Sequence, residues 1–265
     1  MRLAAGLRKP RFSVLGGYFA GTVESVGADV RRFSVGDAVF GSSGMGFGAY
    51  AEKLRVPESR TLIRMPGNMD FVDAAAVPLG GLNALHFLRL AELQAGERIL
   101  INGSGGSIGA HAVMIAKAMG AHVTAVDAGR KAEGLLRLGA DRFVDYETQD
   151  FAAEGATYDV MFDMVAGSSY SRCMSVLSPT GRYLSGNPRL LTMLRAFWTT
   201  RFTGRTARFR FAGETVEELE TLRAMFESGQ IRSIVDTVWP LRKAADAHRQ
   251  VEAEDRVGAV VLQVT

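Results

Sequence analysis

Residues 98–127 constrain the fold of this chain more than any other stretch of its sequence. The apolar run Ile99-Leu100-Ile101 is typical of a buried strand, and it leads into a turn, residues 103–109, that holds four glycines. Helical spacing follows, and a second apolar run ends at Asp127. One buried helix face is expected from residues spaced three or four apart: Ile108, Ala112, Ile115 and Met119. This order of strand, turn, helix and strand predicts a βαβ unit and hence a parallel sheet.

The glycine turn predicts a dinucleotide site. Its nearly bare backbone lets a pyrophosphate approach N–H groups at the positive start of the helix. Asp127 lies 18 residues after Gly109, close to the spacing of about 20 at which an acid accepts the ribose hydroxyls. The motif reads S-x-G-x-x-G (Ser104, Gly106, Gly109), so a serine replaces the first glycine of the usual fingerprint. The prediction of a dinucleotide site therefore depends largely on the strand and helix that flank the turn and on Asp127.

The same turn also satisfies G-x-S-x-G centred on Ser107, which in a strand–turn–helix context is the nucleophile motif of a hydrolase. Asp159 or Asp163, followed by His248, would supply the remaining triad members in the right chain order. This alternative leaves Asp127 without a role, and the dinucleotide interpretation is favoured.

Composition narrows the class of protein. The chain has 265 residues, 47% of them hydrophobic, which is enough for one large or two modest domains. Its net charge of +3 is small and dispersed, so nothing in it demands a nucleic-acid partner. The single cysteine, Cys173, excludes an internal disulfide and a multi-cysteine metal cluster, and a buried thiol is expected. Residues 74–90 are the most apolar run but are interrupted by polar residues, glycine and proline. No membrane span or signal peptide is predicted, and a cytoplasmic location is expected.

The rest of the chain divides into a β-rich part and an α/β part. Strands are expected in residues 21–26, 37–40 and 49–54, and a helix over 73–90 with a break at 78–81. After Asp127, strands and helices alternate as in a doubly wound sheet. Residues 188–211 combine apolar and arginine side chains and are interpreted as a lid or subunit-contact helix, with a membrane or nucleic-acid surface as the weaker alternative. The final strand, 258–264, is expected to join the first domain's sheet.

Several stretches, taken together and in order, resemble the medium-chain dehydrogenase/reductase superfamily, specifically its zinc-free quinone-oxidoreductase-like branch. They are GGYFAGTVESVGADVRRFSVGDAVFG from Gly16, GFGAYAEK from Gly46, AAAVPLGGLNALHFL from Ala74, the glycine turn, LRLGADRFVDY from Leu136, YDVMFDMVAG from Tyr158, and VGAVVLQV near the end. The resemblance implies an α/β fold in which a doubly wound parallel Rossmann-type sheet is inserted into a GroES-like β-barrel catalytic domain, shortened at its N-terminus. The implied domains are 1–82 with 232–265 for the barrel and 83–231 for the dinucleotide-binding part.

The resemblance also implies which residues would contact the cofactor. Gly81-Leu82-Asn83, Val165-Ala166-Gly167 and Gly186-Asn187 would lie near the nicotinamide. The turn would hold the phosphates through Ser104, Gly105, Gly106, Ser107, Ile108 and Gly109. Four residues would surround the adenosine ribose: Asp127, Arg130, Lys131 and Tyr146.

The segment at Gly17-Tyr18 departs from the family pattern. Zinc-dependent relatives place a histidine and a glutamate there, and zinc-free relatives commonly keep an acid. Catalytic zinc needs three protein ligands and an open position, so we expect a protein without metal. Relatives also carry further strands ahead of the segment that residues 1–13 resemble, and those strands contribute to the substrate pocket.

The expected function is zinc-independent hydride transfer from NAD(P)H to quinones or α,β-unsaturated carbonyls. A dinucleotide-binding sensor or interaction protein without turnover is the alternative. Asp127 favours NADH, whereas Arg130, Lys131 and Tyr146 could contact a 2′-phosphate. No catalytic residue is assigned, although Tyr18 and Tyr50 are conceivable proton donors. The expected partners are a small carbonyl or quinone substrate and a second copy in a homodimer.

Overall fold

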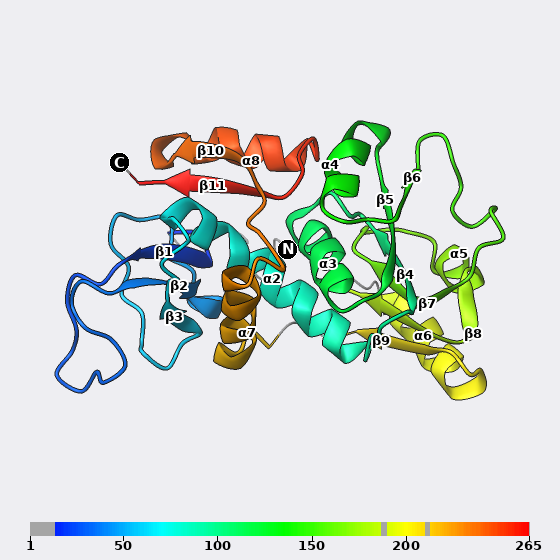
Figure 1. Ribbon diagram of the computed structural model, residues 1–265, viewed down its shortest axis with the longest axis horizontal. Coiled ribbons are helices and arrows are strands. Elements are labelled where there is room, and N and C mark those ends of the chain that lie inside the picture. Colours follow the sequence, from blue (N-terminus) through cyan, green and yellow to red (C-terminus); the bar gives the residue numbers. More distant parts are fainter. Residues whose placement is uncertain (1–13, 187–189, 210–212, 265) are drawn as a thin grey trace.

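The structure is a computed structural model that describes residues 14–186, 190–209 and 213–264. A small antiparallel sheet lies at one end of the long axis and a larger parallel sheet at the other, with helices between them (Figure 1). The small sheet has the order β1-β2-β3. Its strands are β1 (Tyr18–Thr22), β2 (Ala38–Ser42) and β3 (Leu62–Arg64), with the short turn η1 (Gly44–Gly46) after β2. The strand expected at 37–40 corresponds to β2, whereas β1 shares only Gly21 and Thr22 with the strand expected at 21–26.

The large sheet has six parallel strands in the order β6-β5-β4-β7-β8-β9. The strands are β4 (Arg98–Asn102), β5 (His122–Asp127), β6 (Arg142–Asp145), β7 (Tyr158–Asp163), β8 (Leu177–Ser185) and β9 (Thr206–Phe209). Its helices are α3 (Ser107–Ala118), α4 (Ala132–Arg137) after the turn η2 (Gly129–Lys131), α5 (Tyr170–Ser175) and α6 (Leu190–Phe202). The predicted α/β fold class with a Rossmann-type parallel sheet is confirmed.

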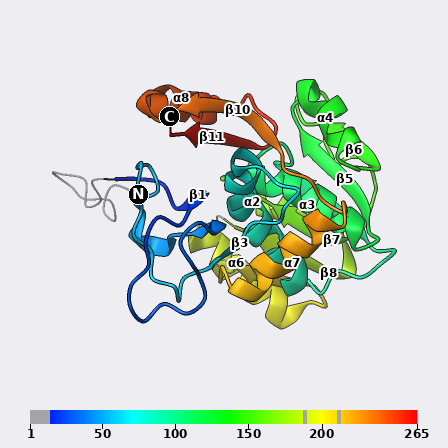
Figure 2. The ribbon, with the colours of Figure 1, turned by 60° about the vertical axis from the view of Figure 1, so that its left-hand side comes forward.

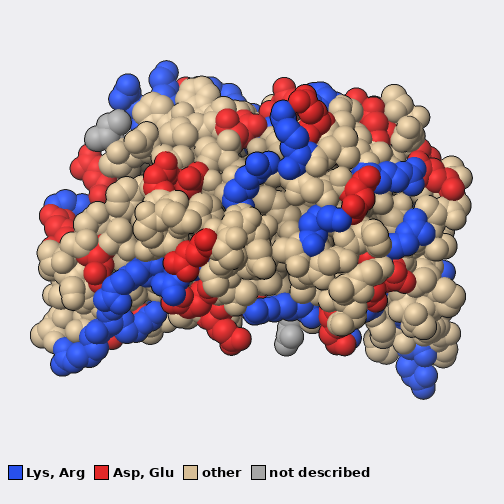
Figure 3. All heavy atoms as spheres, in the orientation of Figure 1, with Lys and Arg blue, Asp and Glu red and all other residues tan. Residues whose placement is uncertain are grey.

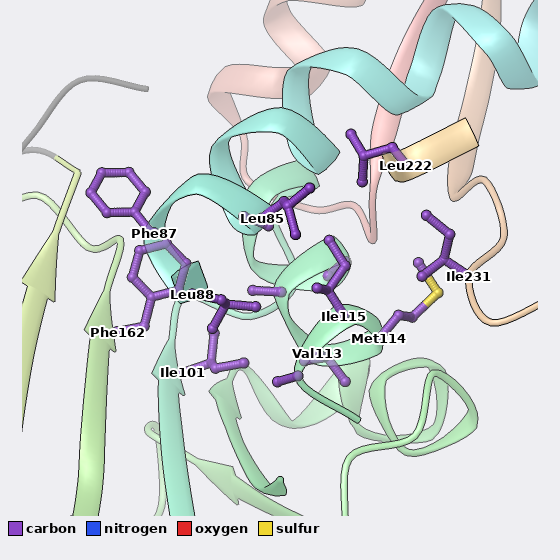
Figure 4. Close-up of a cluster of buried hydrophobic side chains, with 14 of the residues drawn as sticks. Leu85, Phe87, Leu88, Ile101, Val113, Met114, Ile115, Phe162, Leu222 and Ile231 are labelled. Carbon is purple, nitrogen blue, oxygen red and sulfur yellow. The ribbon is translucent and has the colours of Figure 1, made fainter. Parts of the chain in front are cut away.

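Both faces of this sheet are buried, as a doubly wound arrangement requires. Ile99 and Ile101 of β4 belong to one apolar cluster with residues of α3 and of α2 (Phe71–Leu90), while Leu100 between them belongs to a second cluster with α5 and α6. Successive side chains of a strand point to opposite faces, which explains the division. Figure 4 shows Phe87 of α2 beside Phe162 and Leu88 of α2 beside Ile101, so α2 lies over the centre of the sheet.

The expected break in α2 is wrong. The helix runs without interruption from Phe71 to Leu90, although Pro78 lies inside it. The two glycines after Pro78 are sites of close helix packing instead. A Cβ on Gly80 would lie 2.3 Å from Nδ1 of His111 on α3, and a Cβ on Gly81 would lie 2.9 Å from Leu222 on α7 (Val216–Glu227). Small residues here let α3 and α7 approach the α2 backbone. They do not mark a turn.

By length and composition, α2 could cross a membrane, and it is the one such helix among the described residues. In the fold it is a core helix. It is buried against α3, α7 and the small sheet, and residues such as Leu82, Ala84 and Leu88 have no exposed surface. The implied domain boundary between residues 82 and 83 falls within this helix, so α2 itself belongs to both predicted domains.

Two further strand predictions are wrong. Residues 49–54 form no strand, and the chain there bends instead, with the Tyr50 and Ala49 N–H groups donating to Leu15 and Gly16. The last strand, β11 (Ala259–Gln263), does not join the small sheet. It pairs in parallel with β10 (Val235–Pro240), and this two-stranded sheet lies with α8 (Ala244–Glu252), which follows the turn η3 (Leu241–Lys243), apart from β1–β3 (Figure 2).

The segment interpreted as a lid or contact helix forms α6 and the edge strand β9. Several large apolar side chains of α6 face solvent: Met193, Leu194, Phe197, Trp198 and Phe202. Trp198 and Phe202 stack on each other, with ring centroids 5.1 Å apart. Positive and negative side chains are interspersed over most of the face drawn in Figure 3.

Candidate functional site

The glycine turn forms a tight bend between β4 and α3, at the carboxyl edge of the parallel sheet. Gly103 has a left-handed φ of 80°, which favours glycine. A Cβ on Gly109, in the first turn of α3, would lie 2.3 Å from the carbonyl oxygen of Gly103. Gly106 caps α3, and buried Ser104 donates through Oγ to the carbonyl of Val126. The bend and the helix start are therefore locked together.

Asp127, at the end of β5, is tied to this bend. Its Oδ2 accepts the Gly105 N–H at 2.7 Å, and its Oδ1 accepts the Ala128 N–H at 2.9 Å. The Lys131 ammonium lies 2.7 Å from the same Oδ1, and both side chains are more than nine-tenths buried. A Cβ on Gly105 would lie 2.5 Å from Cδ of Lys131. Asp127 is thus neutralised by an ion pair beneath the bend.

The two other predicted ribose neighbours lie at the surface beside this pair. Arg130 donates to Asp255 at 2.6 Å and lies 3.6 Å from Glu147. The Tyr146 ring is largely exposed, and its backbone N–H donates to the Asp127 carbonyl. The structure therefore brings all four predicted residues to the carboxyl ends of β5 and β6.

Sequence reasoning missed the segment from Arg256 to Gly258. The Gly258 N–H donates to the Gly105 carbonyl at 2.9 Å, and Gly106 and Gly258 form a bridge. Gly258 has a φ of 95°, and a Cβ there would lie 2.4 Å from Ile234. Arg256 also donates to the Gly258 carbonyl, while its Nε is buried without a partner, and burial lowers the pKa of its guanidinium. The one sequence feature that could have indicated this contact is Gly258, a glycine directly before the last strand.

A buried carboxylate organises the opposite side of the bend. Asp163, at the end of β7, accepts hydrogen bonds from Asn102 at 2.9 Å and from the Tyr183 hydroxyl at 2.8 Å. It also accepts from Ser168 and from the Val165 N–H. These contacts fix the loop after β7, in which half-exposed Val165 faces the bend: its Cγ2 would lie 3.1 Å from a Cβ on Gly103.

The remaining predicted residues lie on α2 and after β8. Gly186 follows β8 and packs beside Met164, whereas Asn187 lies outside the described residues. Gly81 and Leu82 are buried, and Gly81 packs against Leu222 of α7. Half-buried Asn83 donates to the Leu79 carbonyl at 2.8 Å. The direct cofactor contacts of all these residues stay predictions.

A second polar cluster joins the small sheet to the start of α7. The Tyr18 hydroxyl donates to Oε1 of Glu214 at 2.5 Å, and the Ser42 hydroxyl donates to Oε2 at 2.6 Å. Thr61 donates to the Glu214 backbone carbonyl, and Glu214 itself has a left-handed φ of 46°. Burial and the neighbouring carboxylate raise the pKa of Tyr18, while a hydrogen bond with Asn83 opposes that shift.

The hydrolase alternative finds no support in the geometry. Asp163 is occupied by Asn102, Tyr183 and Ser168, and the His248 ring lies on α8 beside Tyr50, 3.3 Å from its hydroxyl. Among the described residues, no group of three histidine, cysteine or acidic side chains could hold a metal ion. Cys173 is buried, as expected, and burial with nearby Asp163 raises its thiol pKa to about 12.

The bend fits the phosphates of a dinucleotide. Two buried polar atoms that lack partners, Oγ of Ser107 and Nε of Arg256, belong to the segments that meet there. The first lies at the start of α3, whose backbone N–H groups favour an anion, and the second carries a positive charge.

Comparison with known proteins agrees with this fold. The family model described as "Alcohol dehydrogenase GroES-like domain" matches residues 2–67, and the one described as "Zinc-binding dehydrogenase" matches residues 138–262. The chain is 32% identical to a quinone oxidoreductase of Pseudomonas aeruginosa, covering 94% of this chain and 82% of that protein. It therefore belongs to the medium-chain dehydrogenase/reductase superfamily, in its quinone-oxidoreductase-like branch.

Solved structures of similar proteins have the same fold. The quinone oxidoreductase from Coxiella burnetii superposes with a TM-score of 0.88 at 28% identity, covering 98% of this chain and 81% of that one. The CurK enoyl reductase superposes with a TM-score of 0.85 at 26% identity, covering 95% of this chain and 79% of that one. The chain is also 32% identical to NorB, a spectinabilin polyketide synthase system protein of Streptomyces orinoci. That match covers 94% of this chain but only 12% of NorB.

Proposed function

We propose that this protein transfers hydride from NAD(P)H to quinones or α,β-unsaturated carbonyls without a metal ion. The observation that carries the proposal is the bend at Gly105 and Gly106. It lies at the start of α3, is locked to Asp127, and is crossed by the segment that contains Arg256. The similarity to quinone oxidoreductases and to an enoyl reductase supports the choice of acceptors.

The chain's own residues would bind and orient the reactants. The bend and Arg256 would hold the diphosphate, and the loop fixed by Asp163 would place Val165 and Gly186 beside the nicotinamide, with Asn83 across from them. The bound cofactor would supply the hydride. The protein must then hold the acceptor carbon close to the nicotinamide face and polarise its carbonyl through hydrogen bonds.

Both NADH and NADPH are expected to bind, and the preference for NADH remains a prediction from Asp127. Its carboxylate can accept the ribose hydroxyls, since an ionised carboxylate offers about four lone-pair sites. Its ion pair with Lys131, however, reduces the negative charge that would repel a 2′-phosphate. We therefore expect a modest preference rather than exclusion of NADPH.

A sensor or interaction protein that binds dinucleotide without turnover is the second candidate. The bend would bind a dinucleotide in a sensor just as it would in a reductase. The exposed apolar side chains of α6 would then offer a surface for a second copy or for another partner.

One experiment separates these functions. Purified full-length protein is titrated with NADH and NADPH by cofactor fluorescence and then assayed for oxidation of both with quinones and conjugated enones. Turnover supports the reductase, and binding without turnover supports the sensor. Gly105→Ala, which displaces Lys131, should weaken binding about tenfold, while Gly67→Ala, in an open loop position, should not. Absence of binding by the unmodified protein would overturn both functions.

A further inference from the structure

The Tyr18 hydroxyl is held in one orientation by a network of hydrogen bonds that involves Ser42 and Glu214. Tyr18 and Ser42 are direct partners in the β1–β2 ladder, so their side chains leave the sheet on the same side. Both hydroxyls donate to one carboxylate, that of Glu214, which arrives from a distant part of the chain. Ser42 Oγ is also fixed from behind by the Gly44 N–H at 3.0 Å.

The backbone holds Glu214 in an unfavourable conformation to make these contacts. Its left-handed φ is uncommon for a residue with a side chain. Thr61 secures it by donating to its carbonyl. Residues held in sparsely populated backbone conformations cluster at active sites and ligand-binding sites.

This cluster borders the place where the cofactor is proposed to bind. Gly80 of α2 touches Ser107 at the start of α3, since a Cβ there would lie 2.5 Å from the Ser107 carbonyl oxygen. Asn83 lies about one helical turn further along α2, on nearly the same side. Asn83 in turn contacts the Tyr18 hydroxyl. The phenol therefore lies within a short chain of contacts from the bend.

We propose that Tyr18 is the proton donor that completes reduction of an α,β-unsaturated carbonyl, with Glu214 and Ser42 positioning its phenol. This inference rests on the proposed function. Hydride addition to the β-carbon moves the electron pair of the double bond toward the carbonyl oxygen and gives an enolate. The Tyr18 O–H bond then breaks, and its proton forms the new C–H bond at the α-carbon. The phenolate regains a proton from water, so each turnover consumes one proton.

The neighbouring carboxylate suits this role. It keeps the phenol protonated between turnovers, and an enolate carbon is a much stronger base than a phenolate, so the transfer remains favourable. A quinone makes a different demand. Hydride addition gives a hydroquinone anion, which can leave and take its proton from water without a donor on the protein.

The test uses Tyr18→Phe in the full chain, with Tyr50→Phe as the matched control, because the Tyr50 hydroxyl contacts His248 whereas the Tyr18 hydroxyl contacts Glu214. Tyr18→Phe should lower kcat/KM for a conjugated enone by about 10²–10³, within the range for loss of a general acid. Quinone reduction and cofactor affinity should change less than about threefold. In D₂O, an α-methyl enone should gain deuterium on one face with the unmodified protein and on both faces with Tyr18→Phe.

Glu214→Gln provides a second variant if Tyr18→Phe does not fold. It retains a hydrogen-bond acceptor but removes the charge, so we expect a five- to tenfold loss with enones, a shifted pH profile and unchanged quinone reduction. Glu217→Gln, on the exposed first turn of α7, is its control. Unchanged enone kinetics and one-face deuteration in Tyr18→Phe would overturn the inference. Reduction of quinones but not enones by the unmodified protein would overturn it while leaving the proposed function standing.

Discussion

Asp127 and Lys131 form a buried ion pair, with Nζ 2.7 Å from Oδ1, directly beneath the glycine bend. The same carboxylate accepts the Gly105 N–H, so one acid both shapes the bend and holds the Lys131 ammonium beneath it. Removing one partner of a buried pair leaves the other charge uncompensated. A substitution at either residue is therefore expected to change the stability of the loop.

Asp127→Ser should shift cofactor preference toward NADPH. Serine retains a small acceptor for the Gly105 N–H but frees the Lys131 ammonium for a 2′-phosphate. We expect the ratio of NADPH to NADH affinity to rise about tenfold, equivalent to about 1.4 kcal/mol. Titration of both cofactors by fluorescence measures the ratio. If it does not rise, Asp127 is not the discriminator.

Gly80→Ala should destabilise the fold by forcing α2 away from α3. The added methyl would lie 2.3 Å from Nδ1 of His111 and 2.5 Å from the Ser107 carbonyl oxygen, and the latter is backbone that cannot move aside. Overpacking of this kind costs about 1–3 kcal/mol. Urea unfolding of Gly80→Ala and of Gly67→Ala, which has open space, provides the comparison. Equal midpoints would mean that the helices are not in tight contact.

Asp163→Asn should lower the free energy of unfolding by about 3 kcal/mol, because four groups that now donate to a buried carboxylate would face an amide, whose NH₂ cannot accept and whose oxygen carries no full charge. Those partners are Asn102, Val165, Ser168 and Tyr183. Asp159→Asn is the control, since Asp159 accepts a single bond from the Arg98 N–H at an exposed site. A loss below about 1 kcal/mol in Asp163→Asn would contradict this account.

Buried His111 should make the protein less stable in acid. Its Nδ1 lies 2.8 Å from the Ser107 carbonyl, its Nε2 has no partner, and burial lowers its pKa. The unfolded chain binds the proton more readily, so stability is full above the unfolded pKa of about 6.5 and falls as pH drops below it. Unfolding midpoints at pH 8 and pH 5.5 measure the effect. His111→Gln should reduce the difference, whereas His122→Gln, at an exposed position, should not.

The sequence was most informative where local pattern and tertiary contact agree. Burial of the strand residues Ile99, Leu100 and Ile101 follows from their apolar run, and the tight bend follows from its glycines, and both were predicted. The break in α2 was predicted wrongly because a glycine that admits another helix is indistinguishable from one that ends its own. Contacts between distant segments carry no local signal. The pairings of Tyr18 with Glu214 and of Gly105 with Gly258 therefore emerged only from the folded chain.

The hydrogen bond between Gly258 and Gly105 also bears on the order in which the site can mature during synthesis. The ribosome releases the bend, α3 and every strand of the large sheet well before residues 256–258 emerge. A nascent chain can thus assemble the whole sheet while the segment that crosses the glycine bend is still inside the exit tunnel. The contact of this segment with the bend can therefore form only after residues 256–258 have left the ribosome.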